Sequence, residues 1–282
     1  MSLAYTLVIQ ADTLDPHHLH ELAHIVEATH MDHPSPSVAR LRGAAPAQRA
    51  AALALCEQWG YDGAYVEAGR SFAEFGLLVS DMDSTLITIE CIDEIADMNG
   101  LKPQVAAITA RSMRGELDFA SSLTERVALL RGLPESALEQ VYRERVKLMP
   151  GAEALLAACK RHGVKFMLVS GGFTFFTDRL KAELGLDFAH ANQLEVENGA
   201  LTGRVRGPIV DAAAKKRLLI QQREALGLKP EQVLAMGDGA NDLQMLAEAG
   251  VGIAVHAKPV VRAQADIAIN HGGLDRILNL YH

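Results

Sequence analysis

Three short polar clusters have residue types and spacings suited to phosphoryl transfer. In chain order they are the aspartate pair Asp81 and Asp83, the run Ser170 to Gly172, and the segment Gly237 to Asp242. Several carboxylates at one point repel each other unless a hard cation such as Mg²⁺ neutralises them. A serine hydroxyl beside glycine N–H groups can hold phosphate oxygens. No histidine or cysteine adjoins the clusters, so a carboxylate is the nucleophile that remains.

Each cluster alone also has an ordinary structural interpretation. The aspartate pair could be a solvated loop or a helix cap, Ser-Gly-Gly a tight turn, and the glycine-rich segment a plain loop. Each cluster, however, directly follows a predicted strand, and the three strands are Phe75–Ser80, Lys165–Val169 and Val233–Met236. Polar groups at the carboxyl ends of parallel strands converge at one edge of a sheet, which favours a shared site.

The elements around these strands predict a doubly wound α/β domain. Helices and a further strand alternate with them: helices Ala152–His162, Thr177–Leu184, Ala212–Ala225 and Asp242–Ala249, and strand Gly252–Val255. Residues from about 90 to 149 are almost entirely helical and read as a cap inserted after the first strand. We therefore predict an α/β domain over 73–282 with a helical cap at about 90–149.

Residues 1–72 carry no catalytic motif and predict a small α+β domain. Their pattern is β-α-β-α-β, with strands at Tyr5–Ile9, Ser37–Leu41 and Asp62–Glu67. This order is similar to the ACT-like regulatory domains of amino-acid enzymes, which implies amino-acid binding or homodimerisation; a simple spacer is the alternative. The histidines at His20 and His24 lack acidic partners and fit a solvated helix face better than a metal site.

Composition narrows the functional classes. The chain has 282 residues, 49% hydrophobic and 22% charged, which excludes disorder. A net charge of −8 argues against a nucleic-acid surface. Its apolar runs are too short to span a membrane, and the first twenty residues do not resemble a secretory signal. Three widely spaced cysteines fit reduced thiols in the cytoplasm.

The ordered motifs resemble those of the haloacid-dehalogenase-like (HAD) phosphohydrolases. The matching residues are Asp81-Met-Asp-Ser-Thr-Leu, Val169-Ser-Gly-Gly-Phe173, Lys215, and Gly237-Asp-Gly-Ala-Asn-Asp242. Cap and hairpin segments are similar to the phosphoserine phosphatases of that superfamily: Glu90–Ala96, Phe119, Ser121–Val127, Asn192-Gln-Leu and Gly199–Gly203. The resemblance runs from about Phe75 to the C-terminus. It also favours Lys215 over the neighbouring Lys216 as the functional cation.

This resemblance implies a role for each residue at the phosphate end of a site. Asp81 would attack phosphorus, and Asp83 would protonate the leaving oxygen and later activate water. Mg²⁺ would be held by the side chains of Asp81 and Asp238 and the backbone carbonyl of Asp83. The residues implied to hold the phosphate are Ser170, Gly171, Lys215 and Asn241, with Asp242 orienting the lysine or metal waters.

At the other end, Glu90 would pair with a substrate ammonium and Arg126 with its carboxylate. A guanidinium group can bind a carboxylate through two hydrogen bonds. The alternatives without a function are that Glu90 is an acid favoured in the first turn of a helix and that Arg126 is a solvated surface charge. Met113 and Phe119 would line the cap side of the pocket, with core packing as the alternative, and Gly172 would also line it. The implied reaction is Mg²⁺-dependent hydrolysis of O-phospho-L-serine, the last step of serine biosynthesis. Phosphothreonine, phosphohomoserine or a sugar phosphate as substrate, phosphotransfer to another alcohol, and a non-catalytic sensor are the rival hypotheses.

Overall fold

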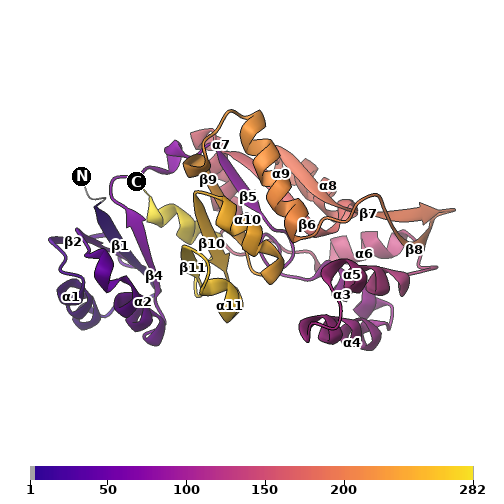
Figure 1. The fold of residues 1–282 in the computed structure, drawn as a ribbon, viewed down its shortest axis with the longest axis horizontal. Helices are drawn as coiled ribbons and strands as arrows, with labels where there is room; N and C mark the ends of the chain where they lie inside the picture. Colours follow the sequence, from indigo (N-terminus) through magenta and orange to yellow (C-terminus); the bar gives the residue numbers. More distant parts are fainter. Residues whose placement is uncertain (1–3, 282) are drawn as a thin grey trace.

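The computed structural model describes residues 4–281, which form a four-stranded and a seven-stranded sheet (Figure 1). The smaller sheet comprises β1 (Tyr5–Gln10), β2 (His30–Ser35), β3 (Val38–Arg42) and β4 (Asp62–Glu67), in the order β2-β3-β1-β4. Helices α1 (Pro16–Ile25) and α2 (Arg49–Gln58) bury Leu7 and Ile9 of β1 on one face of this sheet. The small α+β unit is therefore present.

One prediction for this region is wrong, because the chain runs β-α-β-β-α-β rather than β-α-β-α-β. The additional strand, β2, reads His-Met-Asp-His-Pro-Ser and lies at the sheet edge, with none of its residues buried. An exposed edge strand needs no apolar alternation, so periodicity gave no signal for it.

The opposite face of the small sheet packs on the C-terminal segment. Val8 and Val66 share an apolar core with Phe75 and with η5 (Leu274–Leu280), a 3₁₀ helix. The carboxylate of Asp62 accepts hydrogen bonds from three successive backbone N–H groups, at 2.7, 3.2 and 3.2 Å, in the segment 270–272. These contacts fix the N-terminal unit against one end of the larger sheet.

The larger sheet has the order β11-β10-β9-β5-β6-β7-β8. Its strands are β5 (Leu77–Ser80), β6 (Lys165–Phe173), β7 (Phe188–Glu197), β8 (Ala200–Arg206), β9 (Val233–Gly237), β10 (Val251–Val255) and β11 (Ile267–Ile269). All neighbours pair in parallel except the β7–β8 hairpin. The central strand β5 is buried on both faces, as parallel sheets require.

Helices cover both faces of this sheet, which confirms the doubly wound α/β fold. On one face, Leu78 and Leu168 pack with α7 (Ala152–His162) and α8 (Thr174–Leu184). On the other, Val79 and Val169 pack with α9 (Ala212–Ala225), α10 (Leu243–Glu248) and α11 (Pro259–Arg262). Alternate residues of these strands thus pack into separate hydrophobic cores on the two faces of the sheet. Helix α7 ends at Gly163, whose left-handed φ of 73° supplies the cap.

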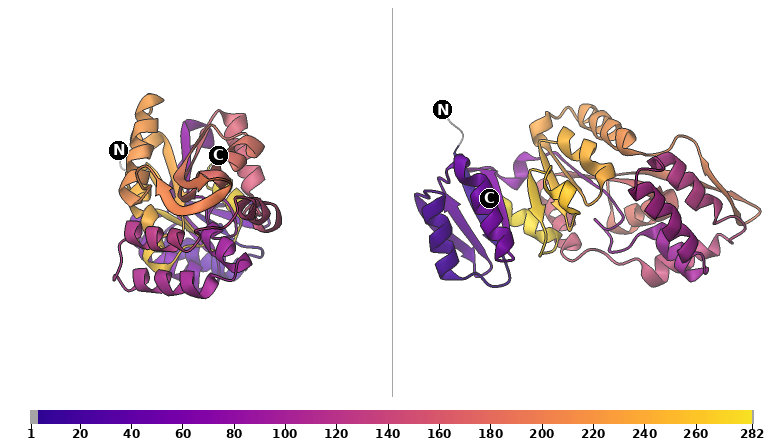
Figure 2. Two further views of the ribbon diagram at one scale, coloured as in Figure 1. Left: turned by 90° about the vertical axis from the view of Figure 1, so that its right-hand side faces the viewer. Right: turned by 60° about the horizontal axis from the view of Figure 1, so that its bottom comes forward.

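Along the chain, four helices come between β5 and α7. They are α3 (Cys91–Met98), α4 (Lys102–Met113), α5 (Phe119–Ala128) and α6 (Ser136–Arg145). Figures 1 and 2 place these cap helices and the N-terminal sheet at opposite ends of the molecule. Within residues 4–281, no helix has both the length and the apolar character needed to cross a membrane.

Candidate active site

Asp81 directly follows β5, and its carboxylate is held from two sides. The backbone N–H of Met82 donates to Oδ1 at 2.7 Å, and Nζ of Lys215 lies 2.7 Å from the same oxygen. The Asp81 side chain is 7% exposed. Two donors on one oxygen fix the rotamer of this buried carboxylate, so Asp81 is presented in a single orientation.

Lys215 is the cation that reaches the acidic residues. It lies on α9 with no exposed surface, and its Nζ contacts Oδ1 of Asp242 at 2.7 Å as well as Asp81. Burial alone would lower the pKa of Lys215, but the charges of Asp242 and Asp81 outweigh it and raise that pKa. Lys216 points elsewhere and pairs with Glu248 at 3.2 Å. The helix places only the first lysine of the pair at the site.

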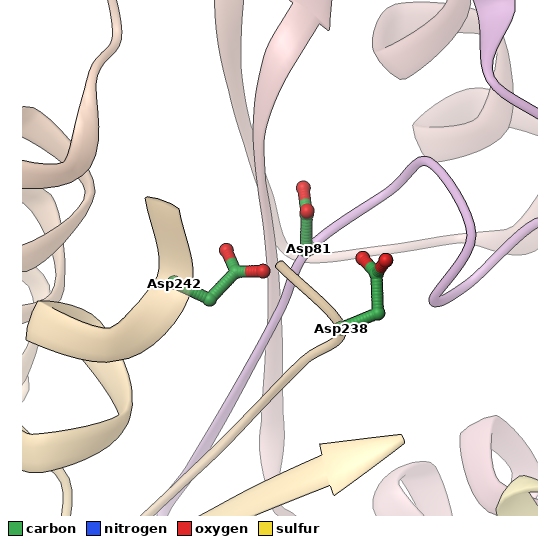
Figure 3. A group of neighbouring side chains, drawn as sticks. All are labelled: Asp81, Asp238 and Asp242. Atoms are coloured by element: carbon green, nitrogen blue, oxygen red, sulfur yellow. The ribbon is translucent and has the colours of Figure 1, made fainter. Parts of the chain in front are cut away.

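Asp81, Asp238 and Asp242 form a compact acidic group (Figure 3). One carboxylate oxygen from each lies within 4.8 Å of the others. Burial and the charge of Asp242 raise the pKa of Asp81 well above its ordinary value, although Lys215 acts against the rise. Burial and the same neighbour raise the pKa of Asp238 to about 6.

A divalent cation would reduce the repulsion among these buried carboxylates, so the group fits a metal site. Asp242 is the least available ligand, because Lys215 takes its Oδ1 and the N–H of Gly239 donates to its Oδ2 at 3.0 Å. Among residues 4–281, Asp238 accepts only a long hydrogen bond of 3.3 Å, from Thr85. Asp81 and Asp238 therefore have the most oxygen capacity left for a metal.

Asp83 lies two residues beyond Asp81, at the start of a tight turn. Its Oδ1 accepts from the N–H of Cys91 at 3.2 Å. Burial, followed by the charge of Glu90, raises the pKa of Asp83 to about 7. Ser84 then adopts a left-handed φ of 55°, and its hydroxyl donates to Glu90 at 2.8 Å. The turn thus ties the aspartate pair to the first residue of the cap.

The Ser170–Gly172 run forms the last part of β6. The N–H of Gly172 donates to Ser170 Oγ at 2.8 Å, while Asn192 on β7 donates to the carbonyl of Gly171 at 2.8 Å. A Cβ at Gly171 would lie 2.7 Å from the ring of Phe119, and one at Gly172 would lie 2.8 Å from Asp83 Oδ2. The glycines therefore permit the close approach of the cap and of the aspartate pair.

These groups surround one cavity of about 730 Å³. The predicted residues that line it are Asp81, Asp83, Glu90, Met113, Phe119, Arg126, Ser170, Gly171, Gly172, Asp238 and Asn241. Lys215 and Asp242 are fully buried outside the lining, where Lys215 contacts both Asp81 and Asp242. The structure thus brings every predicted site residue to the cavity or into contact with its floor.

Arg126, on α5, is half-buried, and its Nε donates to the carbonyl of Ser122 at 3.3 Å. Burial lowers the pKa of Arg126, with the nearby charges of Asp93 and Glu90 opposing the change. Arg126 and Glu90 therefore lie in each other's electrostatic field at the cap side of the cavity.

Asn192 and Lys258 lie at the site but were given no role from the sequence. Asn192 is 1% exposed, and its side chain joins the Gly171 carbonyl to the N–H of Val210, 2.8 Å away. Asn192 is part of the segment Asn192-Gln-Leu that resembles the phosphoserine phosphatases, but no neighbouring residue indicated that β7 would place it beside Gly171 of β6. Lys258 also lines the cavity. It follows the predicted strand Gly252–Val255, so the strand-end argument could have found it.

Comparison with known proteins identifies the class that this fold and site define. Residues 78–247 match the family described as haloacid dehalogenase-like hydrolase, and the chain belongs to that family. Residues 7–51 match a domain of unknown function, DUF4072. Within the hydrolase family, the chain belongs with the phosphoserine phosphatases. It is 54% identical over 213 residues to a phosphoserine phosphatase of Polaromonas sp., covering 74% of this chain and 90% of the relative.

Other relatives agree. A phosphoserine phosphatase of Haemophilus influenzae is 49% identical over 219 residues, covering 78% of this chain and 69% of the relative. A HAD family hydrolase structure from Salmonella enterica serovar Typhi covers 99% of this chain and 98% of its own, at 33% identity and a TM-score of 0.90. A substrate-bound phosphoserine phosphatase structure covers 74% and 99%, respectively, at 39% identity and a TM-score of 0.69. The first of these structures spans the N-terminal unit as well as the hydrolase domain.

Proposed function

We propose that the protein hydrolyses O-phospho-L-serine to L-serine and phosphate through an aspartyl-phosphate on Asp81. One observation carries the proposal: a buried carboxylate, fixed by Lys215 and the Met82 N–H, shares a cavity with Ser170, Gly171 and Gly172. A nucleophile, phosphate-holding donors and a neutralising cation are what phosphoryl transfer needs. The relatives named phosphoserine phosphatase support serine as the alcohol released.

Asp81 and Asp83 both act in each of the two chemical steps, formation and hydrolysis of the aspartyl-phosphate. A carboxylate oxygen of Asp81 bonds to phosphorus while the phosphorus–oxygen bond to serine breaks, and Asp83 gives its proton to the departing serine oxygen. Water then attacks the phosphorus of the aspartyl-phosphate, and Asp83 takes the proton of that water. Free phosphate leaves and the Asp81 carboxylate is regenerated. A pKa of about 7 suits Asp83 to both proton transfers.

The phosphate is held by Ser170, the backbone of Gly171, Lys215 and Asn241, and Asp242 orients the lysine through their 2.7 Å contact. Mg²⁺ would be bound by Asp81 and Asp238 and by the backbone carbonyl of Asp83. When bound, it neutralises the negative charge of these carboxylates and of the phosphate.

The head group of the substrate is recognised at the cap. Glu90 binds the ammonium and Arg126 binds the carboxylate, since both line the cavity and face a common space. Phe119, Met113 and Gly172 complete the walls. The cap helices exclude water from the reacting groups once substrate is bound.

We further propose that residues 1–72 form a separate domain, that 73–282 form the catalytic domain with its cap at about 90–149, and that the enzyme acts in the cytoplasm, in serine biosynthesis. Both faces of the small sheet are packed, one by α1 and α2 and the other by η5. Homodimerisation through this domain would therefore use the exposed edge strand β2.

Phosphate release from O-phospho-L-serine tests the proposal. The protein with Mg²⁺ is expected to release phosphate, EDTA to stop it, and Asp81→Asn to abolish it while leaving the circular dichroism spectrum unchanged. Arg126→Ala is expected to raise KM for phosphoserine far more than KM for an aryl phosphate. A panel including phosphothreonine, phosphohomoserine and an alcohol acceptor examines the alternatives. Faster turnover of another ester than of phosphoserine, or near-normal activity of Asp81→Asn, would contradict the proposal.

A further inference from the structure

Lys258 lies at the same sheet edge as the acidic residues. It follows β10, and β10 pairs in parallel with β9, the strand that leads to Asp238. The intervening His256 has a left-handed φ of 45°, and its N–H donates to the carbonyl of Ile269 at 2.8 Å. The turn that brings Lys258 to the cavity is therefore a fixed feature of the fold.

The ammonium group of Lys258 is available to a ligand. The residue is exposed and lines the cavity, and within residues 4–281 no carboxylate lies within 4.0 Å of its Nζ. Lys215 and Lys216, in contrast, are both paired with carboxylates. A cation without an ion-pair partner at the mouth of an acidic cavity is suited to bind an anionic group of the substrate.

The charges at the cavity indicate which group that is. Among the described residues, two cationic side chains line it, Arg126 and Lys258, and Glu90 lies in the field of both. Burial raises the pKa of Glu90, and these two positive charges oppose the rise. An α-amino acid with its ammonium at Glu90 would place its adjacent carboxylate between the two cations.

We propose that Lys258 binds the carboxylate of the substrate together with Arg126, and so selects α-amino-acid phosphates over other phosphate esters. This inference rests on the proposed function. The phosphate end of the cavity is formed by buried groups, Asp81 and Ser170, and already has Lys215. Lys258 is on the exposed side with Glu90 and contacts the head group rather than the phosphate.

The test compares Lys258→Gln and Lys258→Arg with the unaltered enzyme on three esters. O-Phospho-L-serine carries an ammonium and a carboxylate, O-phosphoethanolamine only the ammonium, and p-nitrophenyl phosphate neither. Lys258→Gln is expected to raise KM for phosphoserine about 5- to 20-fold, with kcat and the other two KM values changed less than about twofold. Lys258→Arg is expected to restore most of the affinity, since it keeps the charge.

Lys160→Gln is the matched control, because it removes one exposed positive charge from α7, remote from the cavity lining. It is expected to leave all three KM values unchanged. An equal rise for the three esters in Lys258→Gln would assign Lys258 to the phosphate and overturn the inference, as would an unchanged KM for phosphoserine. Failure of the unaltered enzyme to hydrolyse phosphoserine would instead overturn the proposed function.

Discussion

Replacing Lys215 by methionine removes a positive charge that compensates two buried carboxylates. Methionine keeps the length and apolar stem of lysine, so the change isolates the ammonium group. The side chains of Asp81 and Asp242 are 7% and 0% exposed, and each lies 2.7 Å from Nζ of Lys215. Breaking a buried ion pair by removing one partner costs about 3–5 kcal/mol in the free energy of unfolding. We expect a loss in this range, together with loss of phosphatase activity.

The origin of that loss can be separated from general damage. Lys216→Met is the control: its exposed pair with Glu248 is expected to contribute less than about 1 kcal/mol. Asp242→Asn in the Lys215→Met background removes one of the two uncompensated charges and is expected to restore about 1–3 kcal/mol. The unaltered protein, the single variants Lys215→Met and Asp242→Asn, and the double variant are compared by urea denaturation in EDTA, so that no metal substitutes for the lost ammonium.

The pH dependence of the Lys215→Met variant gives a second check. Without the ammonium, the folded-state pKa of Asp81 rises further above its unfolded value. A carboxyl with a raised folded pKa binds more protons when folded, so the variant gains stability as pH falls through that pKa. Its deficit relative to the unaltered protein is expected to be smaller at about pH 5 than at about pH 8. A Lys215→Met cost no larger than that of Lys216→Met, or an Asp242→Asn cost that simply adds to it, would refute the reasoning.

Three further predictions concern positions outside the reacting groups. Asn192→Ala leaves two backbone groups without their side-chain partner, at a cost of about 1–3 kcal/mol each, and is expected to lower both the stability and kcat/KM. Gln193→Ala, at the exposed neighbouring residue, should lower neither. An equal effect of the two variants would show that Asn192 does not hold Gly171 in place. Asp62→Asn weakens the three hydrogen bonds that hold the N-terminal unit and is expected to lower the thermal midpoint. Asp12→Asn removes an ion pair with Arg276 across the same interface, but its side chain is 98% exposed, so it should lower the midpoint much less. Equal midpoints for the two variants would show that the Asp62 bonds do not hold the interface. Burial raises the pKa of the Cys56 and Cys159 thiols to about 12, so Ellman's reagent at neutral pH is expected to label no thiol until the protein unfolds, and rapid labelling of the native protein would show that the thiols are accessible.

Much of the fold could be predicted from the apolar runs that mark strands in the sequence. Apolar runs ending in Asp81, Ser170 and Gly237 mark buried parallel strands, and parallel strands end at one edge. That rule alone places Asp81, Ser170 and Asp238 around one cavity, 157 residues apart at the extremes (238 minus 81). Local pattern and topology agree at these positions, which is why the prediction succeeds.

Other features depend on tertiary contacts that no local pattern encodes. Strand β2 exists because it pairs with β3, and β11 has three residues that pair with β10. The bracing of Gly171 by Asn192 requires β6 and β7 to be adjacent, with a register shift between them. The N–H of Cys91 meets Asp83 only because the cap begins with a sharp turn at Ser84. Such contacts are set by register and turn geometry, which side-chain type does not reveal.

The covalent step on Asp81 is the most direct point at which to test the account. Radiolabelled O-phospho-L-serine, mixed with the enzyme and Mg²⁺ and quenched rapidly in acid, should leave label on the protein. Peptide mapping should place that label on Asp81 as a hydroxylamine-sensitive acyl-phosphate, and Asp81→Asn should carry none. Phosphate release without any trapped label, or label on a different residue, would contradict the account.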